Sequence, residues 1–380
     1  VTNVLYPLVD QRAIVVCCGP GGVGKTTTAA ALAVEGASRG RRACVVTIDP
    51  AKRLADALGL EALTDTAGLV EGDWPGELWA LMLDTRSTFD ALVRRHAAST
   101  AQAERILDNR LYRNLAGALS GTQEYMAMEK LYELDEDGAV TPEGDSVRFD
   151  LIVVDTPPTR NALDFIDAPR RLTRFLDNRI FRLLIMPTRA YLRAMSVATQ
   201  AFLRTVSAVV GAEVVADAVA FFQAFEGMEE GFRLRAHRVF ELLSDESTAF
   251  VLVASPNRDT VEETLFFSDK LGDAGIDVDA LVVNRLHPRF GAAGPSETSG
   301  ALRARAASLA GTPIGPLYAN LADFRQVAER EEAHVASLTA RLPGTPVGRV
   351  PFLEDDVHDL AGLAGVAGHL FGPAAGRAAS

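Results

Sequence analysis

Residues 19–26 read GPGGVGKT, and they lie between the apolar run AIVVCC (13–18) and the alanine-rich run TTTAAALAVEGASRG (26–40). The first run is too short for a helix and rich in β-branched residues, so it predicts a buried strand. The second run predicts a helix closed by Gly40. Glycines between a strand and a helix let backbone N–H groups converge on phosphate oxygens at the positive end of the helix. The stretch therefore predicts a phosphate-binding loop; the alternative is a glycine-rich turn that binds nothing.

Two residues of this loop carry its chemistry. Lys25 would reach the β- and γ-phosphates of a nucleoside triphosphate, and the hydroxyl of Thr26 would bind Mg²⁺. We therefore expect ATP and magnesium as the bound groups. The residues expected to hold them through the loop and the first turn of the helix are Gly19, Gly21, Gly22, Val23, Gly24, Lys25, Thr26 and Thr27.

Strands and helices alternate along much of the chain. ACVVTID (43–49) predicts a second buried strand, which completes a strand–helix–strand unit and implies parallel pairing. Further strands are predicted at 78–83, 150–155, 249–255 and 280–284, with helical segments between the later ones. The alternation predicts an α/β fold with a doubly wound, mostly parallel sheet of the P-loop NTPase type.

Two long stretches, 86–145 and 161–247, carry helical periodicity without convincing strands. We expect them to pack as helices beside the sheet, the second as an inserted helical subdomain. The predicted division is a nucleotide-binding domain of residues 1–85, 146–160 and 248–372, a helical segment of 86–145, a helical subdomain of 161–247 and a flexible tail of 373–380.

Composition places the chain among globular proteins and excludes several functions. Its 380 residues include 48% hydrophobic and 23% charged side chains, which excludes wholesale disorder. With 38 basic against 50 acidic side chains the formal net charge is −12, which argues against nucleic acid as a partner. No apolar run is long enough to span a bilayer, and the first residues lack a secretory pattern. We therefore expect a cytoplasmic protein.

An aspartate ends the apolar run DLIVVD (150–155). A carboxylate at the carboxyl end of a buried strand is where an acid would assist Mg²⁺, directly or through a water molecule. Asp155 is followed by TPPTRN (156–161), which indicates a loop that senses the γ-phosphate. The alternative is that Asp155 only caps a helix.

A second acidic segment, DPAKRLAD (49–56), follows the second predicted strand. A carboxylate here could orient the attacking water, because phosphoryl transfer depends on positioning more than on covalent chemistry. The alternative is a proline turn capped by Asp49, with a helix starting near Lys52; the two interpretations are compatible.

Three motifs together resemble the anion-transporting, arsenical-pump-driving ATPases and their relatives that target tail-anchored membrane proteins. The motifs are GPGGVGKTTT (19–28), DPAKRLADALG (49–59) and DTPPTRNALDF (155–165). SGTQEYMAMEKL, ASPNRDTVEETLFF, VVNRLHP and VPFLEDDV also have counterparts in that family. The resemblance implies a dimeric ATPase in which the nucleotide closes the two subunits against each other.

The resemblance also implies roles for individual residues. Asp56 matches the acid that activates water, so Asp56 and Lys25 are the expected catalytic residues. Asp155 matches the acid linked to magnesium. Asparagine and proline at strand ends are otherwise common turn formers. The positions that match the family's adenine contacts are Asn284, Pro351 and Phe352.

One position of the loop departs from the family. The family usually places a lysine directly after the first glycine, and that lysine reaches the phosphate of the opposite subunit. Here the residue is Pro20, which carries no charge and no N–H. We therefore expect a heterodimer in which a paralogous subunit supplies the lysine. The alternatives are a homodimer with an arginine rerouted to the site, or a homodimer with a slow rate.

The cysteines and one apolar helical segment indicate which species the protein could transport or bind. Cys17, Cys18 and Cys44 fall in apolar runs without metal-site spacing, so buried thiols are expected. The metalloid- and zinc-binding cysteines of the family have no counterpart, which puts arsenite transport in doubt. The segment 163–206 could form a groove for a hydrophobic client or a membrane protein, although such residues more often pack a core.

Charge is unevenly spread over the second helical stretch. Residues 161–210 contain eight arginines and three aspartates, whereas residues 211–250 contain three arginines and eight acidic residues. We expect the two halves to pair within one subdomain. The alternative is that the basic half docks on an anionic membrane surface, which would make the protein peripheral at the membrane.

Two other functions remain open. A partition or septum-positioning ATPase would act as a scaffold on DNA or membrane, but the net charge and the lysine-free C-terminal helix disfavour it. A P-loop kinase would phosphorylate a small acceptor, and the long helical stretches fit that function less well.

Overall fold

The computed structural model describes residues 4–48, 53–110, 112, 122–156, 217, 220–221, 224, 227–290 and 298–372. The chain divides into two compact units. The sheet unit comprises Val1–Met82, Val140–Ala162 and Glu246–Ser380, and the helical unit comprises Leu83–Ala139 and Leu163–Asp245.

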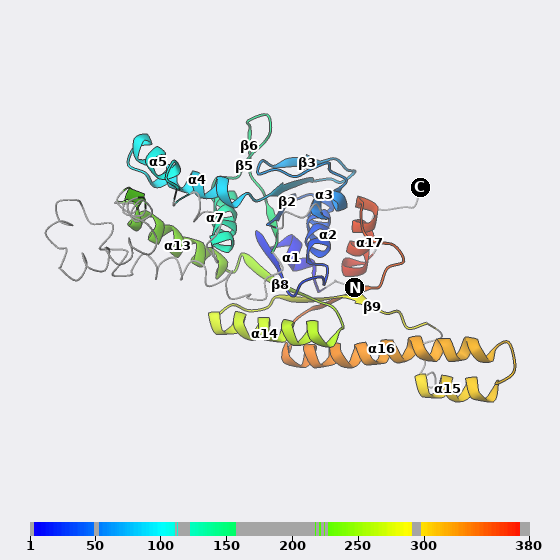
Figure 1. The fold of residues 1–380 in the computed structure, drawn as a ribbon. Coiled ribbons are helices and arrows are strands. Elements are labelled where there is room, and N and C mark those ends of the chain that lie inside the picture. Colours follow the sequence, from blue (N-terminus) through cyan, green and yellow to red (C-terminus); the bar gives the residue numbers. More distant parts are fainter. Residues whose placement is uncertain are drawn as a thin grey trace, which may run out of the picture. The chain divides into compact units, whose positions relative to one another are not determined.

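The sheet unit is built on an eight-stranded sheet with the order β10-β9-β8-β1-β7-β2-β4-β3 (Figure 1). Among the described residues, neighbouring strands pair in parallel except for β3 with β4. The strands are β1 (Ile14–Cys18), β2 (Arg42–Thr47), β3 (Gly68–Val70), β4 (Glu77–Met82), β7 (Leu151–Asp155), β8 (Thr248–Ala254), β9 (Ala280–Leu286) and β10 (Val347–Pro351).

The central strands are buried on both faces. All five residues of β1 are buried, as are all five of β7 and all seven of β8. Side chains alternate between the two faces of a strand. Val15 and Cys17 belong to the buried cluster formed with α2 (Lys25–Ser38) and α17 (Leu360–Phe371), whereas Ile14, Val16 and Cys18 are buried outside that cluster. Helices on both faces explain why these strands are continuous apolar runs.

The two faces of the sheet are covered by different helices. The helices of this unit are α1 (Tyr6–Asp10), α2 (Lys25–Ser38), α3 (Arg53–Leu58), α14 (Arg258–Ala274), α15 (Ser299–Ser308), α16 (Gly315–Arg341) and α17 (Leu360–Phe371). The connection from β1 through α2 leads to β2, toward the β3 edge of the sheet. The connection from β8 through α14 leads to β9, toward the β10 edge. Right-handed crossovers then place α2 and α14 on opposite faces. Helix α2 packs on β1, β7 and β2, and α14 packs on β8.

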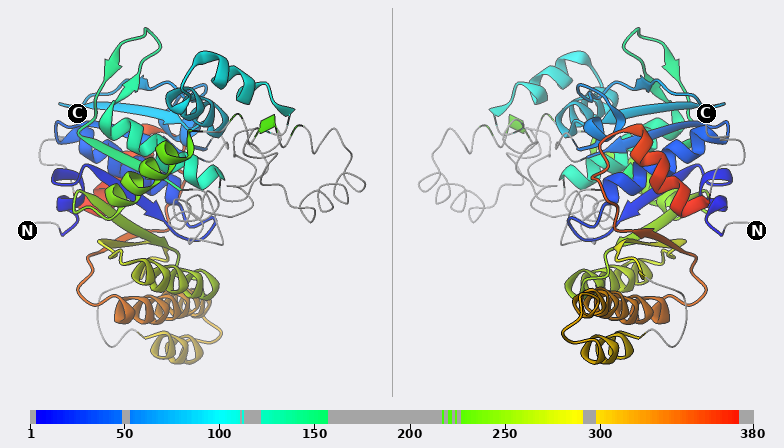
Figure 2. Two further views of the ribbon diagram at one scale, coloured as in Figure 1. Left: turned by 90° about the vertical axis from the view of Figure 1, so that its left-hand side faces the viewer. Right: turned by 90° about the vertical axis from the view of Figure 1, so that its right-hand side faces the viewer.

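A helical hairpin stands between β9 and β10. Helices α15 and α16 pack against each other, and α16 also packs against α14 and β9, so that three helices are stacked on this side (Figure 2). Ser299 at the start of α15 donates a hydrogen bond of 2.6 Å to Glu329 of α16, and Arg303 pairs with Asp323 at 2.8 Å. These contacts tie the short helix to the long one.

The helical unit contains α4 (Thr85–His96), α5 (Thr100–Leu107), α7 (Thr122–Glu136) and α13 (Glu229–Leu243). Its core includes Val93, Ile106, Met126 and Phe232, one from each helix. Arg235 of α13 pairs with Glu129 of α7 at 2.6 Å, and both side chains are buried. Burial raises the pKa of Glu129, and the charge of Arg235 opposes that rise.

The prediction of a doubly wound, mostly parallel sheet is confirmed. The predicted helix after the loop is α2, which ends at Ser38, and Gly40 has a φ of +85°. The helix expected near Lys52 begins at Arg53. The predicted domain boundaries remain a prediction. The division into two units does not test them, because much of the second helical stretch lies outside the described residues.

The expectation that 86–145 contains no strand is wrong at one end. β5 (Ala139–Val140) pairs with β6 (Ser146–Val147), and Gly144, with a φ of +91°, lies in the turn between them. Strands of two residues are too short to show alternation. β3 and β10 also lack a sequence signal, because β3 has three residues and β10 contains Gly348.

Several predicted features lie outside the described residues. They are the segments 49–52 and 157–161, the arginine-rich stretch and the proposed client groove within 161–210, and the tail 373–380. Among the residues that the structure describes, no helix combines the length and the apolar composition needed to cross a membrane.

Candidate nucleotide-binding site

The loop of residues 19–26 joins β1 to α2 and requires glycine at two positions. Gly19 has a φ of +145°, and a Cβ placed on it would lie 2.2 Å from the carbonyl oxygen of Val253 in β8. Gly24 has a φ of +94°, and a Cβ there would lie 2.2 Å from Nδ2 of Asn284 in β9. Any side chain would collide and would strain the backbone. The loop is therefore packed directly against β8 and β9.

Lys25 is the first residue of α2, and only 6% of the residue is exposed. Its Nζ donates a hydrogen bond of 2.9 Å to the carbonyl oxygen of Pro20, on the opposite side of the loop. Burying an ammonium group costs free energy unless oxygen atoms or an anion surround it. With the positive end of α2 beside it, this ammonium group gives the loop a positive charge that suits an anion.

Behind the loop, two hydroxyl groups meet one buried carboxylate. Asp155 at the end of β7 is 1% exposed, and its Oδ2 accepts hydrogen bonds from Thr26 Oγ1 at 2.7 Å and from Thr47 Oγ1 at 3.1 Å. Thr156 donates from Oγ1 to the carbonyl oxygen of Cys17 at 2.7 Å, which ties the chain after β7 to β1. Hydroxyl and carboxylate oxygens are ligands that Mg²⁺ prefers. The donor set therefore fits a magnesium ion.

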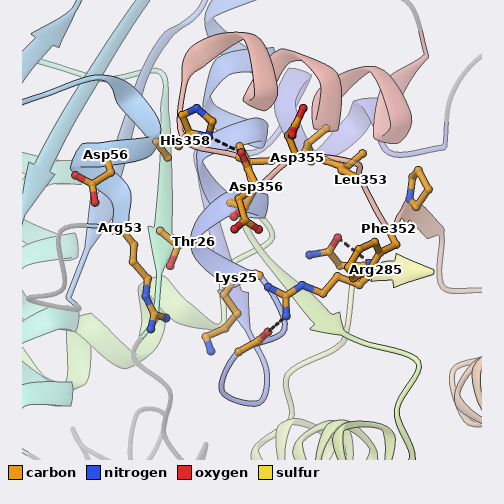
Figure 3. A pocket seen from close by; sticks show the side chains of 18 of the residues that line it. Lys25, Thr26, Arg53, Asp56, Arg285, Phe352, Leu353, Asp355, Asp356 and His358 are labelled. Carbon is orange, nitrogen blue, oxygen red and sulfur yellow. Dashed lines mark hydrogen bonds between the residues drawn. The ribbon is translucent and has the colours of Figure 1, made fainter. Parts of the chain in front are cut away.

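A cavity of about 670 Å³ opens over the loop and the first turn of α2 (Figure 3). It lies at the carboxyl ends of the strands, beside the point where β1 and β8 lead to opposite sides of the sheet. Ligands of open α/β sheets bind at such a point. Of the predicted site residues, the lining includes Gly22, Gly24, Lys25, Thr26, Thr27, Asp56, Asn284, Pro351 and Phe352. Gly19, Gly21 and Val23 belong to the loop without lining the cavity, and Asp155 is buried behind Thr26.

The far end of the cavity is open and is formed by β9 and β10. Asn284 donates from Nδ2 to the carbonyl oxygen of Val23 at 2.9 Å. Phe352 is 56% exposed, and its ring stacks on His287 with centroids 5.4 Å apart and an interplanar angle of 16°. His287 is held in turn by Glu331 of α16, 2.6 Å from Nδ1. An exposed, supported aromatic ring suits the flat face of a base.

Asp56 lies on α3, where its side chain is exposed at the rim of the cavity. Figure 3 shows its carboxylate turned away from Lys25, whereas Arg53 of the same helix extends into the cavity on the side of Lys25. The segment 49–52, which connects α3 to β2, lies outside the described residues. The structure thus brings Asp56 to the cavity but not into contact with the loop.

Several residues of the site were not singled out from the sequence. Arg53 stands within a quoted motif, and Thr47 precedes the end of the second strand, so position relative to strand ends could have indicated both. Arg285 and His287 stand within the quoted motif VVNRLHP, but that motif did not indicate their partners. Glu331 of α16, which holds His287, had no sequence signal. The acidic and basic residues of the β10–α17 connection that line the cavity are Asp355, Asp356 and His358.

The three cysteines lie on strands β1 and β2 of the sheet. Cys17, Cys18 and Cys44 are buried. Burial, and secondly the negative charge of Asp155, raises the pKa of the Cys17 thiol. Burial raises the pKa of Cys18 to about 12, against the opposing charge of Lys25. A buried thiol with a raised pKa is protonated at neutral pH and is therefore a poor nucleophile, which agrees with the expected buried thiols.

Comparison with known proteins identifies relatives. The family model for anion-transporting ATPases matches residues 12–293. ATPase GET3 from Malassezia globosa is 26% identical over 285 residues, which cover 74% of this chain and 76% of the relative. ATPase GET3B from Arabidopsis thaliana is 30% identical over 285 residues, 71% of this chain and 63% of the relative. A putative arsenical pump-driving ATPase 2 from Aquifex aeolicus is 26% identical over 278 residues, 71% of this chain and 79% of the relative.

Proposed function

The chain belongs to the anion-transporting ATPase family and is an ATPase of that type, and from this premise we propose how its site works. The protein hydrolyses the γ-phosphate of ATP with Mg²⁺ and acts as a nucleotide-driven dimeric switch. The observation that carries this proposal is the 2.7 Å contact of Thr26 with Asp155, which joins the phosphate-binding loop to the end of β7.

The phosphate end has the groups that hydrolysis needs. Lys25, buried against Pro20 O, holds the β- and γ-phosphates, and the loop glycines expose N–H groups to them. Thr26 and Asp155 would hold magnesium, Asp155 directly or through water, and the ion would neutralise charge on the phosphates. The buried hydroxyl–carboxylate cluster fixes both ligands before any nucleotide arrives, which reduces the reorganisation that catalysis requires.

The switch that we propose comprises the segments on either side of the loop. Asp56 orients the attacking water once the segment 49–56 closes on the γ-phosphate, and the segment 155–162 senses the same group. The support is positional: Asp56 stands on the helix that borders the cavity, and Thr156 at the start of the second segment bonds to β1 behind the loop. Loss of the γ-phosphate releases both segments.

We propose a dimer as the working form, and Pro20 favours a heterodimer. A cation supplied by a second subunit can increase phosphoryl-transfer rates by about 10³–10⁵. Since Pro20 cannot supply one, a homodimer of this chain would lack the cation at both sites. A paralogous subunit with lysine at this position would restore it at the site of this chain.

We also propose what kind of partner or client the ATPase acts on. A relative is named as arsenical pump-driving, and by that analogy we propose a membrane-protein partner or a hydrophobic client handled from the cytoplasm. Arsenite itself is disfavoured, since all three cysteines are buried. Among the described residues, no group of three or more histidine, cysteine and acidic side chains is placed to hold a metal ion; the proposed magnesium site uses one carboxylate and a hydroxyl group.

The test is phosphate release from Mg-ATP by the purified chain, without any acceptor, with and without its paralogous partner. We expect slow, Mg²⁺-dependent release by the chain alone and an increase of at least about 10³-fold with the partner. Full turnover by the chain alone contradicts the heterodimer. A requirement for a small acceptor contradicts the ATPase switch and favours a kinase.

A further inference from the structure

Strand β9 contains a bulge at the edge of the nucleotide cavity. Its register against β10 pairs Val283 with Arg349 and Leu286 with Pro351, so two residues of β9 face a single residue of β10. The second of the two, Arg285, has a φ of +62° and is the one non-glycine residue with a positive φ in the described part of the chain. That backbone costs about 1 kcal/mol for an L-residue other than glycine. Bulges of this kind redirect side chains next to active sites.

The bulge turns two consecutive side chains toward the same loop. In a regular strand, neighbouring side chains point to opposite faces. Here Asn284 donates from Nδ2 to Val23 O, and Arg285 donates from one terminal nitrogen to Gly22 O, both at 2.9 Å. Asn284 Oδ1 also accepts the N–H of Arg285 at 2.9 Å, which fixes the bulge. Figure 3 shows the Arg285 side chain crossing from β9 to the loop beside Lys25.

The two bonds fix two peptide planes of the phosphate-binding loop. In a trans peptide, the carbonyl and the following N–H point in opposite directions. Holding the Gly22 and Val23 carbonyl groups toward β9 therefore turns the N–H groups of Val23 and Gly24 to the other side of the loop. A phosphate group binds to N–H groups that point together.

We propose that Arg285 is a positioning residue for the nucleotide: through Gly22 O it aims the loop N–H groups at the phosphates, and its charge favours the bound anion. The inference rests on the proposed nucleotide site. The partner of Arg285 in the loop is the neutral carbonyl group of Gly22, so this hydrogen bond does not cancel the positive charge of the guanidinium group. Asp355 and Asp356 also line the cavity, and Arg285 offsets their repulsion of a phosphate.

The main variant is Arg285→Gly, because glycine adopts a φ of +62° without strain and only the side chain is lost. Arg285→Lys restores the charge without the fixed fork geometry. The matched control is Arg349→Ala on the adjacent strand, whose guanidinium is bound to Glu332 at 2.9 Å and does not line the cavity. Measurements are the Kd of ADP and ATP by calorimetry, and KM and kcat with Mg-ATP.

For Arg285→Gly we expect the Kd of both nucleotides and the KM to rise by about 10- to 100-fold, as for loss of a charged hydrogen bond. The kcat should change by less than about threefold, because the contact acts on bound substrate and transition state alike. Arg285→Lys should recover part of the affinity, and Arg349→Ala should bind like the wild type.

Unchanged nucleotide Kd in Arg285→Gly overturns the inference while the proposed ATPase site stands. So does a fall in kcat at constant KM, which would place Arg285 in the chemical step. A wild-type protein that binds no ATP, or binds it equally well after Lys25→Met, overturns the proposed site itself. The two failures are therefore distinguishable.

Discussion

The two ends of the nucleotide cavity are built in different ways. At the phosphate end, Lys25 and Asp155 are almost completely buried. Lys25 bonds to Pro20 of the loop, and Asp155, at the end of the central strand β7, accepts from Thr26 of α2 and Thr47 of β2. At the base end, Phe352 directly follows the edge strand β10, is 56% exposed and stacks on His287, which directly follows β9.

The contrast separates two tasks. Charges and hydrogen bonds act more strongly where water is excluded, so the groups that must stabilise a changing phosphate are placed in the buried centre. Recognition of a base needs area and stacking, which an open aromatic platform provides. We therefore expect changes at the phosphate end to lower kcat and changes at the base end to raise KM.

The largest effect is expected for Lys25→Met. The side chain keeps its length but loses the charge that faces the phosphates, so kcat/KM for Mg-ATP should fall by about 10³-fold or more. Steady-state phosphate release measures this. The control is Lys270→Met on α14, a half-buried lysine paired with Asp273 at 2.9 Å that does not line the cavity. A loss of less than tenfold would show that the buried end does not carry the chemistry.

The second effect concerns Asp155→Asn. The amide can keep the contacts to Thr26 and Thr47 but removes the negative charge that magnesium requires. We expect kcat to fall by about 10²-fold and the Mg²⁺ concentration for half-maximal rate to rise. A magnesium titration of phosphate release gives both values. An unchanged magnesium requirement would contradict the proposed role of this carboxylate.

A smaller effect is expected at the open end. Phe352→Ala removes the ring that stacks on His287, and KM for Mg-ATP should rise by about tenfold with kcat within about twofold. The control is Leu317→Ala on α16, which is also exposed but does not line the cavity. If Phe352→Ala lowered kcat and left KM unchanged, the proposed division of the cavity would be wrong.

The smallest effect is expected for the ion pair between Arg349 of β10 and Glu332 of α16, which lies outside the cavity. The hydrogen bond from Arg349 lowers the pKa of Glu332 below its usual value. A lowered carboxyl pKa gives stability above the pKa of the unfolded chain, and this stability is lost as pH falls through the folded pKa. Both side chains are more than a third exposed, so Arg349→Ala should cost at most about 0.5 kcal/mol at neutral pH.

Chemical unfolding of both proteins at about pH 7 and about pH 3 measures this difference. We expect the gap in unfolding free energy to shrink at the lower pH, because Glu332 takes up a proton as the pH falls. A gap that persists in acid would assign the contribution to packing of the Arg349 stem instead of its charge.

The phosphate end could be predicted from the sequence more completely than the base end. β1, the loop, α2 and β7 are contiguous in sequence or carry long apolar runs, so their type and order follow from local pattern. β10 and the hairpin α15–α16 lie beyond the residues 12–293 that the family model matches. The alternation of β10 is broken by Gly348, and its pairing with β9 was not readable from the chain.

The sequence by itself determined the phosphate-binding loop, the strand that ends in Asp155 and the parallel sheet that brings them together. These depend on glycine conformations, apolar periodicity and right-handed connections, all of which act over short stretches of chain. Only the tertiary structure decided that Arg285 turns toward Gly22 and that Phe352 rests on His287 and Glu331. A bulge and a pairing between β9 and β10 create these contacts, and such pairing is fixed by residues that are far apart along the chain.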